Sequence, residues 1–449
     1  MKGFTRRSFG AVLSAAVVLP LIAGCGSSGG VGGAPSEVKQ DATAKQTINY
    51  WTWYPDDKTV QPAIDAFEKA NPDISVKLRI FASKDYQKQL PLALNGGESI
   101  DVVGIQVSAM TETIKSKLLP VDDYAKDLTG DYTKSLDSKI VKQATEAASD
   151  GKLYGLPMGA VASPILYFNN KLLSDNGIAV PKTASDLAEA AKKLKAAGVP
   201  TPVVQTGDGW WQEEVLFGIA GQTDPNLSDS IFRGDASWDQ KPVVEALKKY
   251  KSLFDNGAID TSVLSLTGSA PTEAFTSGKA AFLVDGSWQA SLMSADYRKA
   301  NKISLTDVGA EALPVVDGGT PAVRGLAEGG MGIPKSSTHV AAAAKFVSFM
   351  TYGAGVEEWN KNLVYTPTAK TDFALGDSTL TTQAAKDGLS TIQKVAAAPG
   401  SQRTSQQDFL NTVEGPTILD VLRGNISAED AAKKLQSEWS SGRYPKAGK

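Results

Sequence analysis

The 449-residue sequence contains one cysteine and one histidine. A single cysteine cannot form an intrachain disulfide, so the stability of the fold must come from the size of its core. One histidine excludes a site with several histidine ligands, and a Ser-His-Asp triad would have to use His339. His339 lies at 336–341, where a helix is expected to begin, and we expect it to be a solvated surface residue.

Clusters of basic residues and the common catalytic motifs are also missing. The formal net charge is −3 without a basic patch, which argues against a nucleic-acid partner. The sequence has no Gly-x-Ser-x-Gly, no P-loop and no Gly-x-Gly-x-x-Gly followed by a suitable acid. These absences exclude several kinds of catalytic chemistry, and we expect no metal site and no cofactor.

The composition is that of a soluble globular protein. Hydrophobic residues make up 42% of the chain and charged residues 21%. A chain of this length is long for one core, so two domains are expected.

The first 24 residues have the pattern of a signal peptide. Lys2, Arg6 and Arg7 precede an apolar run at 10–23, which Pro20 interrupts. This run is shorter than the ~20 residues that a membrane-spanning helix needs. Residues 25–45 are rich in Gly, Ser and Ala without periodicity, which predicts a flexible tether.

The leader ends in Leu-Ile-Ala-Gly-Cys at 21–25, which resembles the bacterial lipobox. That resemblance implies that Cys25 is lipidated and becomes the mature N-terminus. Thr-Arg-Arg-Ser-Phe at 5–9 also resembles a twin-arginine export signal, and the choice between this route and Sec stays open.

Beyond the tether, strand and helix patterns alternate. Residues 74–80 alternate strictly between apolar and polar, as in a half-buried strand, and 100–105 are apolar throughout. Alternation of strands and helices predicts right-handed crossovers and a parallel sheet. Strands are predicted at 48–54, 74–80, 100–105, 164–168, 203–204, 280–284 and 313–316. Helices are predicted at 86–94, 187–197, 242–254, 271–277, 340–350 and from 427. Residues 325–332 form a Gly-rich passage.

The stretch at 278–288 joins a predicted helix end, a buried strand and a tryptophan. Gly278 ends the helix, 280–284 form the strand, and Asp285-Gly286-Ser287 break it before Trp288. In open α/β sheets, ligands bind at the carboxyl ends of the strands. Trp288 is therefore a candidate site residue, and the alternative is that it fills a seam between helix and sheet.

Several stretches, taken in order, resemble the family 1 extracellular solute-binding proteins, which are lipoprotein receptors of sugar-importing ABC transporters. The matching stretches are the lipobox, Trp-Thr-Trp at 51–53, and residues 95–103, 150–157, 166–171, 177–183 and 275–288. The resemblance implies an α/β, two-lobed periplasmic-binding-protein fold, with two doubly wound lobes joined by a hinge of three crossing segments. The implied N-terminal lobe is 46–157 with 331–364, and the C-terminal lobe is 158–330 with 365–449. The crossings are expected near 156–157, 329–330 and 364–365.

The resemblance also implies a binding function rather than an enzyme, with no catalytic residues. A member of this family is an extracytoplasmic, monomeric receptor that closes around a sugar or oligosaccharide and delivers it to the transmembrane subunits of an ABC permease. Lipidation of Cys25 would anchor it to the bacterial cell membrane.

A sugar presents a flat C–H face and a rim of hydroxyls, so its receptor needs aromatic rings together with carboxylates or amides. Such residues follow several of the predicted strands, and a Gly-rich crossing lets a ligand approach the backbone. The family pattern commonly places Trp288, and either Trp210 or Trp211, against the sugar. The candidate ligand-binding residues are Trp53, Tyr54, Asp56, Gln106, Ser108, Asp208, Trp210, Trp211, Asp285, Trp288, Glu328 and Gly330.

Two other functions remain open from the residues. An extracellular glycoside hydrolase needs two carboxylates about 5–9 Å apart, and the 49 acidic residues leave such a pair open. A receptor of the same fold for a polyamine would use acids around an aromatic box. The sequence leaves the sugar, its length and anomer, and the permease undefined.

Overall fold

The computed structural model describes residues 45–449 except 364–365, 371–378, 397–405, 445 and 447–449. The predicted signal peptide, Cys25, nearly all of the tether and the crossing expected at 364–365 therefore lie outside the described residues.

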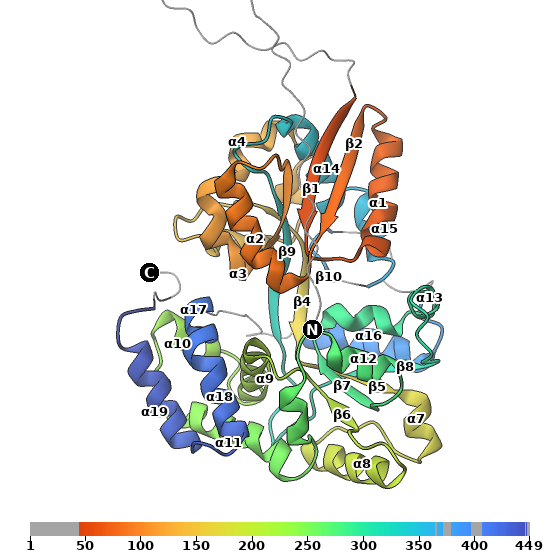
Figure 1. Cartoon of the computed structure of the whole chain (residues 1–449), viewed down its shortest axis with the longest axis vertical. Coiled ribbons are helices and arrows are strands. Elements are labelled where there is room, and N and C mark those ends of the chain that lie inside the picture. The colour runs from red at the N-terminus through yellow and green to blue at the C-terminus, as the bar shows by residue number, and fades with distance from the viewer. Residues whose placement is uncertain (1–44, 364–365, 371–378, 397–405, 445, 447–449) are drawn as a thin grey trace, which may run out of the picture. The chain divides into compact units, whose positions relative to one another are not determined.

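The described chain forms two α/β lobes, each built around its own sheet (Figure 1). The first sheet has the order β10-β4-β9-β3-β1-β2, and the second has the order β6-β7-β5-β8. The strands are β1 Gln46–Thr52, β2 Ile74–Ile80, β3 Val102–Gln106, β4 Leu156–Ser163, β5 Ile165–Asn169, β6 Val203–Val204, β7 Phe282–Asp285, β8 Val308–Ala312, β9 Arg324–Gly332 and β10 Thr366–Pro367.

Helices cover both sheets, and α9, α10, α11, α18 and α19 form a helical group beside the second sheet (Figure 1). The α-helices are α1 Asp57–Ala70, α2 Ser83–Gly96, α3 Val107–Ile114, α4 Val121–Tyr124, α5 Tyr132–Ser135, α6 Ser138–Glu146, α7 Asn170–Asp175, α8 Ala184–Ala196, α9 Gly209–Gly221, α10 Leu227–Arg233, α11 Lys241–Asp255, α12 Ala270–Thr276, α13 Ala295–Ala300, α14 Val340–Thr351, α15 Gly355–Asn360, α16 Gln383–Ala396, α17 Gln407–Phe409, α18 Gly415–Leu422 and α19 Ala428–Trp439. The 3₁₀-helices are η1 Lys115–Lys117, η2 Ala125–Asp127, η3 Thr261–Ser265 and η4 Ser287–Met293, and η5 Leu410–Glu414 is a π-helix.

The first lobe follows the predicted strand–helix alternation. β1 pairs in parallel with β2 and with β3, as expected for strands connected through helices. α1 begins where the Asp56 carboxylate accepts the Thr59 N–H at 2.9 Å, and it buries Val60, Ile64 and Phe67 against the sheet. The carboxyl ends of these strands point toward the second lobe (Figure 1).

The Gly-rich passage at 325–332, which contains the crossing expected near 329–330, lies within a strand, β9. β9 pairs antiparallel with β3 on one side and with β4 on the other. Its glycines are needed for close packing, because a Cβ on Gly332 would lie 2.7 Å from both Ile105 Cδ1 and the Tyr154 carbonyl. A strand of this composition carries no apolar periodicity, so its pairing was not predictable from the sequence pattern.

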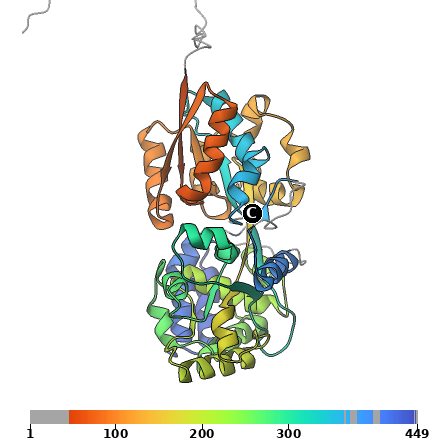
Figure 2. The same cartoon turned by 90° about the vertical axis from the view of Figure 1, so that its right-hand side faces the viewer.

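The paired strands β4 and β9 run from one lobe to the other (Figures 1 and 2). Residues of β4 up to Val161 pack in the core of the first lobe, and Ala162 packs in the core of the second. The register of the pair shifts on both sides of Gly159. The two lobes are therefore joined by a hydrogen-bonded ribbon with an irregularity in one strand.

The second sheet is mixed. β6 and β7 are parallel, whereas β5 pairs antiparallel with β7 and β8. The strand predicted at 313–316 is wrong, because β8 ends at Ala312 and Val315 forms a single bridge with Thr183. Pro314 has no N–H to donate to a strand ladder, which explains this end.

A charged cluster is buried in the second lobe between β9 and α9. Arg324 contacts Glu213 at 2.9 Å and Glu214 at 3.5 Å. The Ser163 hydroxyl of β4 donates to Glu214 at 2.6 Å. Glu414 is fully buried nearby, and neither of its carboxyl oxygens has a hydrogen-bond partner among the described residues. The cluster ties both connecting strands to the helical group.

Candidate functional site

A pocket of about 240 Å³ lies in the second lobe, beyond the carboxyl ends of β6 and β7. Because these strands are parallel, Thr206 and Asp285 leave the sheet at the same edge. The pocket is lined by Thr206, Trp210, Gly268, Ser269, Pro271, Thr272, Asp285, Trp288 and Gln289. Three of the sequence candidates, Trp210, Asp285 and Trp288, are thus brought together.

The tryptophans of the site have different surroundings. Trp210 and Trp288 are half-buried, and their ring centroids lie 6.2 Å apart at the pocket. Trp211 is 0% exposed, and its ring packs 6.1 Å from that of Trp288. Trp211 therefore belongs to the core behind the pocket. Trp210 is the member of the adjacent pair that borders the pocket.

Trp288 lies on η4 and packs against the cores of both lobes. The turn before it is held from two sides. The Ser287 hydroxyl accepts the Ala162 N–H of β4 at 2.9 Å, and the Tyr167 hydroxyl donates to the Gly286 carbonyl at 3.0 Å. The position of Trp288 is thus fixed relative to a strand that connects the lobes.

Asp285 is a fixed hydrogen-bond acceptor in the pocket wall. Its carboxylate accepts the Gly286 N–H at 2.8 Å and the Gln289 amide at 2.9 Å, and that amide also donates to Thr272 at 3.1 Å. Burial raises the pKa of Asp285 to about 6, against the opposing effect of hydrogen bonds from Gln289, Gly286, Trp288 and Thr272. The group is charged at neutral pH.

Asp208 lies beside the pocket at the start of α9. It accepts the Gly268 N–H at 3.1 Å and the Thr206 hydroxyl at 3.0 Å, and it forms an ion pair at 2.7 Å with Lys84 of the first lobe. Burial alone would raise the pKa of Asp208. The hydrogen bonds that its carboxylate accepts, of which the one from Lys84 has the largest effect, outweigh burial and lower the pKa. Asp208 therefore stays ionised at neutral pH.

Three further contacts join the lobes near the pocket. The Tyr54 hydroxyl donates to the Trp288 carbonyl at 3.2 Å. The Tyr297 hydroxyl donates to Asp56 at 3.5 Å, and Lys58 donates to Asn301 at 3.0 Å. The candidates Tyr54 and Asp56 thus contact the opposite lobe directly. Trp53 stacks on Tyr86 within the first lobe, with centroids 5.6 Å apart.

The remaining candidates gather where β3 meets β9 in the first lobe, and none of them lines the pocket. The Gln106 amide donates to Glu328 at 3.4 Å and to Ser83 at 3.3 Å, and its carbonyl accepts the Gln87 amide. The Ser108 hydroxyl is buried without a partner among the described residues. Gly330 pairs with Ile105 through its backbone.

Lys84, Thr272 and Gln289 are not among the residues predicted from the sequence. Lys84 is an exposed residue in the first turn of α2, and nothing in its local sequence indicates a partner 124 residues away. Gln289 follows Asp285 by four residues, but Asp285 ends β7 and Gly286 is extended, so the helical i,i+4 rule gave no local signal for this contact.

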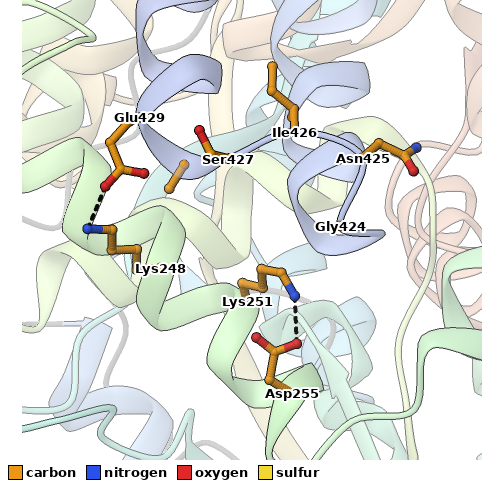
Figure 3. Close-up of a pocket in the computed structure, with 9 residues that line it drawn as sticks. Lys248, Lys251, Asp255, Gly424, Asn425, Ile426, Ser427 and Glu429 are labelled. Atoms are coloured by element: carbon orange, nitrogen blue, oxygen red, sulfur yellow. Dashed lines mark hydrogen bonds and ion pairs between the residues drawn. The ribbon is translucent and has the colours of Figure 1, made fainter.

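A larger hollow of about 500 Å³ lies between α11 and the start of α19 (Figure 3). Lys248 pairs with Glu429 at 2.7 Å, and Lys251 pairs with Asp255 at 2.6 Å. No aromatic side chain is among the residues lining it, which are Lys248, Lys251, Asp255, Gly424, Asn425, Ile426, Ser427, Ala428 and Glu429. It therefore lacks the ring faces that a sugar site needs.

Among the residues that the structure describes, no group of three or more His, Cys, Asp or Glu side chains is arranged to hold a metal ion. In the same part of the chain, every helix is too short or too polar to cross a bilayer.

Comparisons with known proteins agree with this architecture. The family model for bacterial extracellular solute-binding proteins matches residues 51–352. The galactooligosaccharide-binding protein of Bacillus subtilis is 26% identical over 63% of this chain and 63% of its own length. The multiple sugar-binding protein of Streptococcus mutans is 25% identical over 72% of this chain and 75% of its own length. A structure of maltose-bound T. maritima MalE3 superposes with a TM-score of 0.69 and 19% identity, covering 88% of this chain and 99% of that chain.

Proposed function

The chain belongs to the bacterial extracellular solute-binding proteins, and we propose that it is the extracytoplasmic receptor of an ABC importer for a sugar or oligosaccharide. It binds its ligand without transforming it and delivers it to the transmembrane subunits of the permease. In this proposal it acts as a monomer without a cofactor, anchored to the bacterial cell membrane through a lipid on Cys25.

The observation that supports the sugar ligand is the composition of the pocket. Two half-buried tryptophan rings border it, and Asp285, Gln289 and Thr272 supply polar atoms beside them. Aromatic faces cover the C–H surface of a sugar while fixed polar groups bond to its hydroxyls. We assign Trp210, Asp285 and Trp288 as ligand contacts.

Ligand binding is coupled to closure of the lobes in this proposal. Tyr54, Asp56 and Asp208 take part in contacts that exist only when the lobes are together. A ligand that touches both lobes shifts the population toward that state. The proposed lobe boundaries, between 157 and 158 and between 330 and 331, fall within β4 and β9.

A thermal-shift screen with neutral mono- and oligosaccharides tests the proposal. A ligand at about 100 times its Kd should stabilise the folded protein by about 2.7 kcal/mol. Chromatography of the incubated sugars should show stoichiometric binding and no new products. Cleavage would indicate a glycoside hydrolase, and stabilisation by spermidine but by no sugar would indicate a polyamine receptor.

A further inference from the structure

The ionisable groups that line the pocket are negative only. Of the nine residues that line it, Asp285 is the one ionisable group, and none is basic. Its carboxylate is held by the Gly286 N–H and the Gln289 amide, so it cannot turn away from an incoming ligand. A ligand bound in the pocket against the two tryptophans lies beside this charge.

A negatively charged ligand would be repelled there. Asp285 is half-buried, and charges interact more strongly where water is partly excluded. Burial already disfavours its ionised form, as the raised pKa of about 6 shows. A second anion in the same pocket would add repulsion to that penalty.

The positively charged side chains near the pocket already interact with other groups of the protein. Lys84 is paired with Asp208 at 2.7 Å. α9 begins directly after Asp208, which makes no side-chain capping hydrogen bond to the helix but places a negative charge beside the end where a helix favours an anion. Arg298 is buried next to η4, and its guanidinium donates to the carbonyls of Leu292 at 2.6 Å and Thr306 at 3.0 Å. These cations are therefore committed to groups of the protein.

We propose that Asp285 determines specificity in this pocket by admitting neutral sugars and excluding sugar acids and sugar phosphates. This inference rests on the proposed function and deepens it, because it selects one charge class among the sugars. The Asp285 carboxylate can accept an O–H of a neutral sugar and so orient it. When the ligand carries its own negative charge, the same carboxylate repels it.

Calorimetric titration of matched ligands tests the inference. The probes are galactose, galacturonic acid and galactose 6-phosphate, with glucose, glucuronic acid and glucose 6-phosphate as a second series. At pH 7.5 a neutral sugar should bind at least ~10-fold more tightly than its acid or phosphate, a ratio that ~1.4 kcal/mol of repulsion produces. Asp285→Asn should narrow this ratio, whereas Asp175→Asn, which removes an exposed charge on the same lobe, should leave it unchanged.

A second measurement needs no substitution. Lowering the pH of the unmodified protein from 7.5 to 5 protonates Asp285 but leaves a uronic acid ionised, so the preference over the uronic acid should shrink. The role of Asp285 would be overturned if a sugar acid or sugar phosphate bound as tightly as the neutral sugar or more tightly. It would also be overturned if neither Asp285→Asn nor the change of pH altered the ratio of the two affinities. Either result would leave the proposed sugar receptor intact. Failure of every sugar to bind would overturn the proposed function as well.

Discussion

Replacing Trp210 and Trp211 separately by alanine should produce opposite defects, although the residues are adjacent on α9. Successive helical residues point about 100° apart, so one ring borders the pocket and the other enters the core. Trp211 is 0% exposed, and its truncation leaves a cavity that should cost ~3–5 kcal/mol of stability. Trp210 is half-buried, and its truncation should cost clearly less.

The binding effects should be reversed. Loss of the Trp210 ring removes stacking and apolar burial against the sugar, of the order of 1.5–3 kcal/mol, which corresponds to a ~10-fold or greater loss of affinity. Trp211→Ala, where it remains folded, should bind with affinity close to that of the unmodified protein.

Urea unfolding without ligand and calorimetric titration with the sugar found in the screen measure the two quantities. Trp238→Ala serves as a control for loss of a fully buried tryptophan away from the pocket. The reasoning is refuted if Trp210→Ala unfolds as readily as Trp211→Ala and yet binds sugar normally.

Three further predictions follow from residues described above. Trp288→Ala should lower sugar affinity ~10-fold or more and diminish ligand-induced quenching of tryptophan fluorescence, and normal binding by this variant would place the ligand elsewhere. Burial raises the pKa of Glu414 well above its usual range. The folded state therefore keeps a proton that the unfolded state loses near pH ~4.3, and the free energy of unfolding should fall as the pH rises above that value. Glu414→Gln should flatten the pH dependence of the urea midpoint. An unchanged slope in that variant would show that Glu414 does not hold the proton. Cys25→Ser should release the protein from the membrane fraction without altering sugar affinity, and full retention in membranes with normal processing would contradict lipidation.

Elements with strong local signals could be predicted from the sequence. The alternation at 74–80 matches β2 residue for residue, because one face of that strand is more buried than the other. Thr183 and Asp186 form the expected capping box of α8, and Ser427 caps α19 at the predicted position. In these elements the information lies within a few neighbouring residues.

Features that depend on distant partners were not predictable. β9 is a strand because β3 and β4 hydrogen-bond to it on both sides, and its Gly-rich sequence carries no strand pattern of its own. The order of residues also gave no reason to prefer Trp210 over Trp211 as the pocket residue, since that depends on how α9 rotates against its neighbours. The role of Lys84 requires that the two lobes meet.

The ribbon of β4 and β9 restricts how the lobes can move. Two hydrogen-bonded strands bend across their flat face but resist sliding, because a slip of one residue would move every side chain to the wrong face. The ladder is already interrupted around Gly159, so bending should concentrate there. We expect the opening motion to have essentially one mechanical degree of freedom. Distances between spectroscopic labels on different lobes would then change together along a single path, whereas distances within each lobe would stay constant.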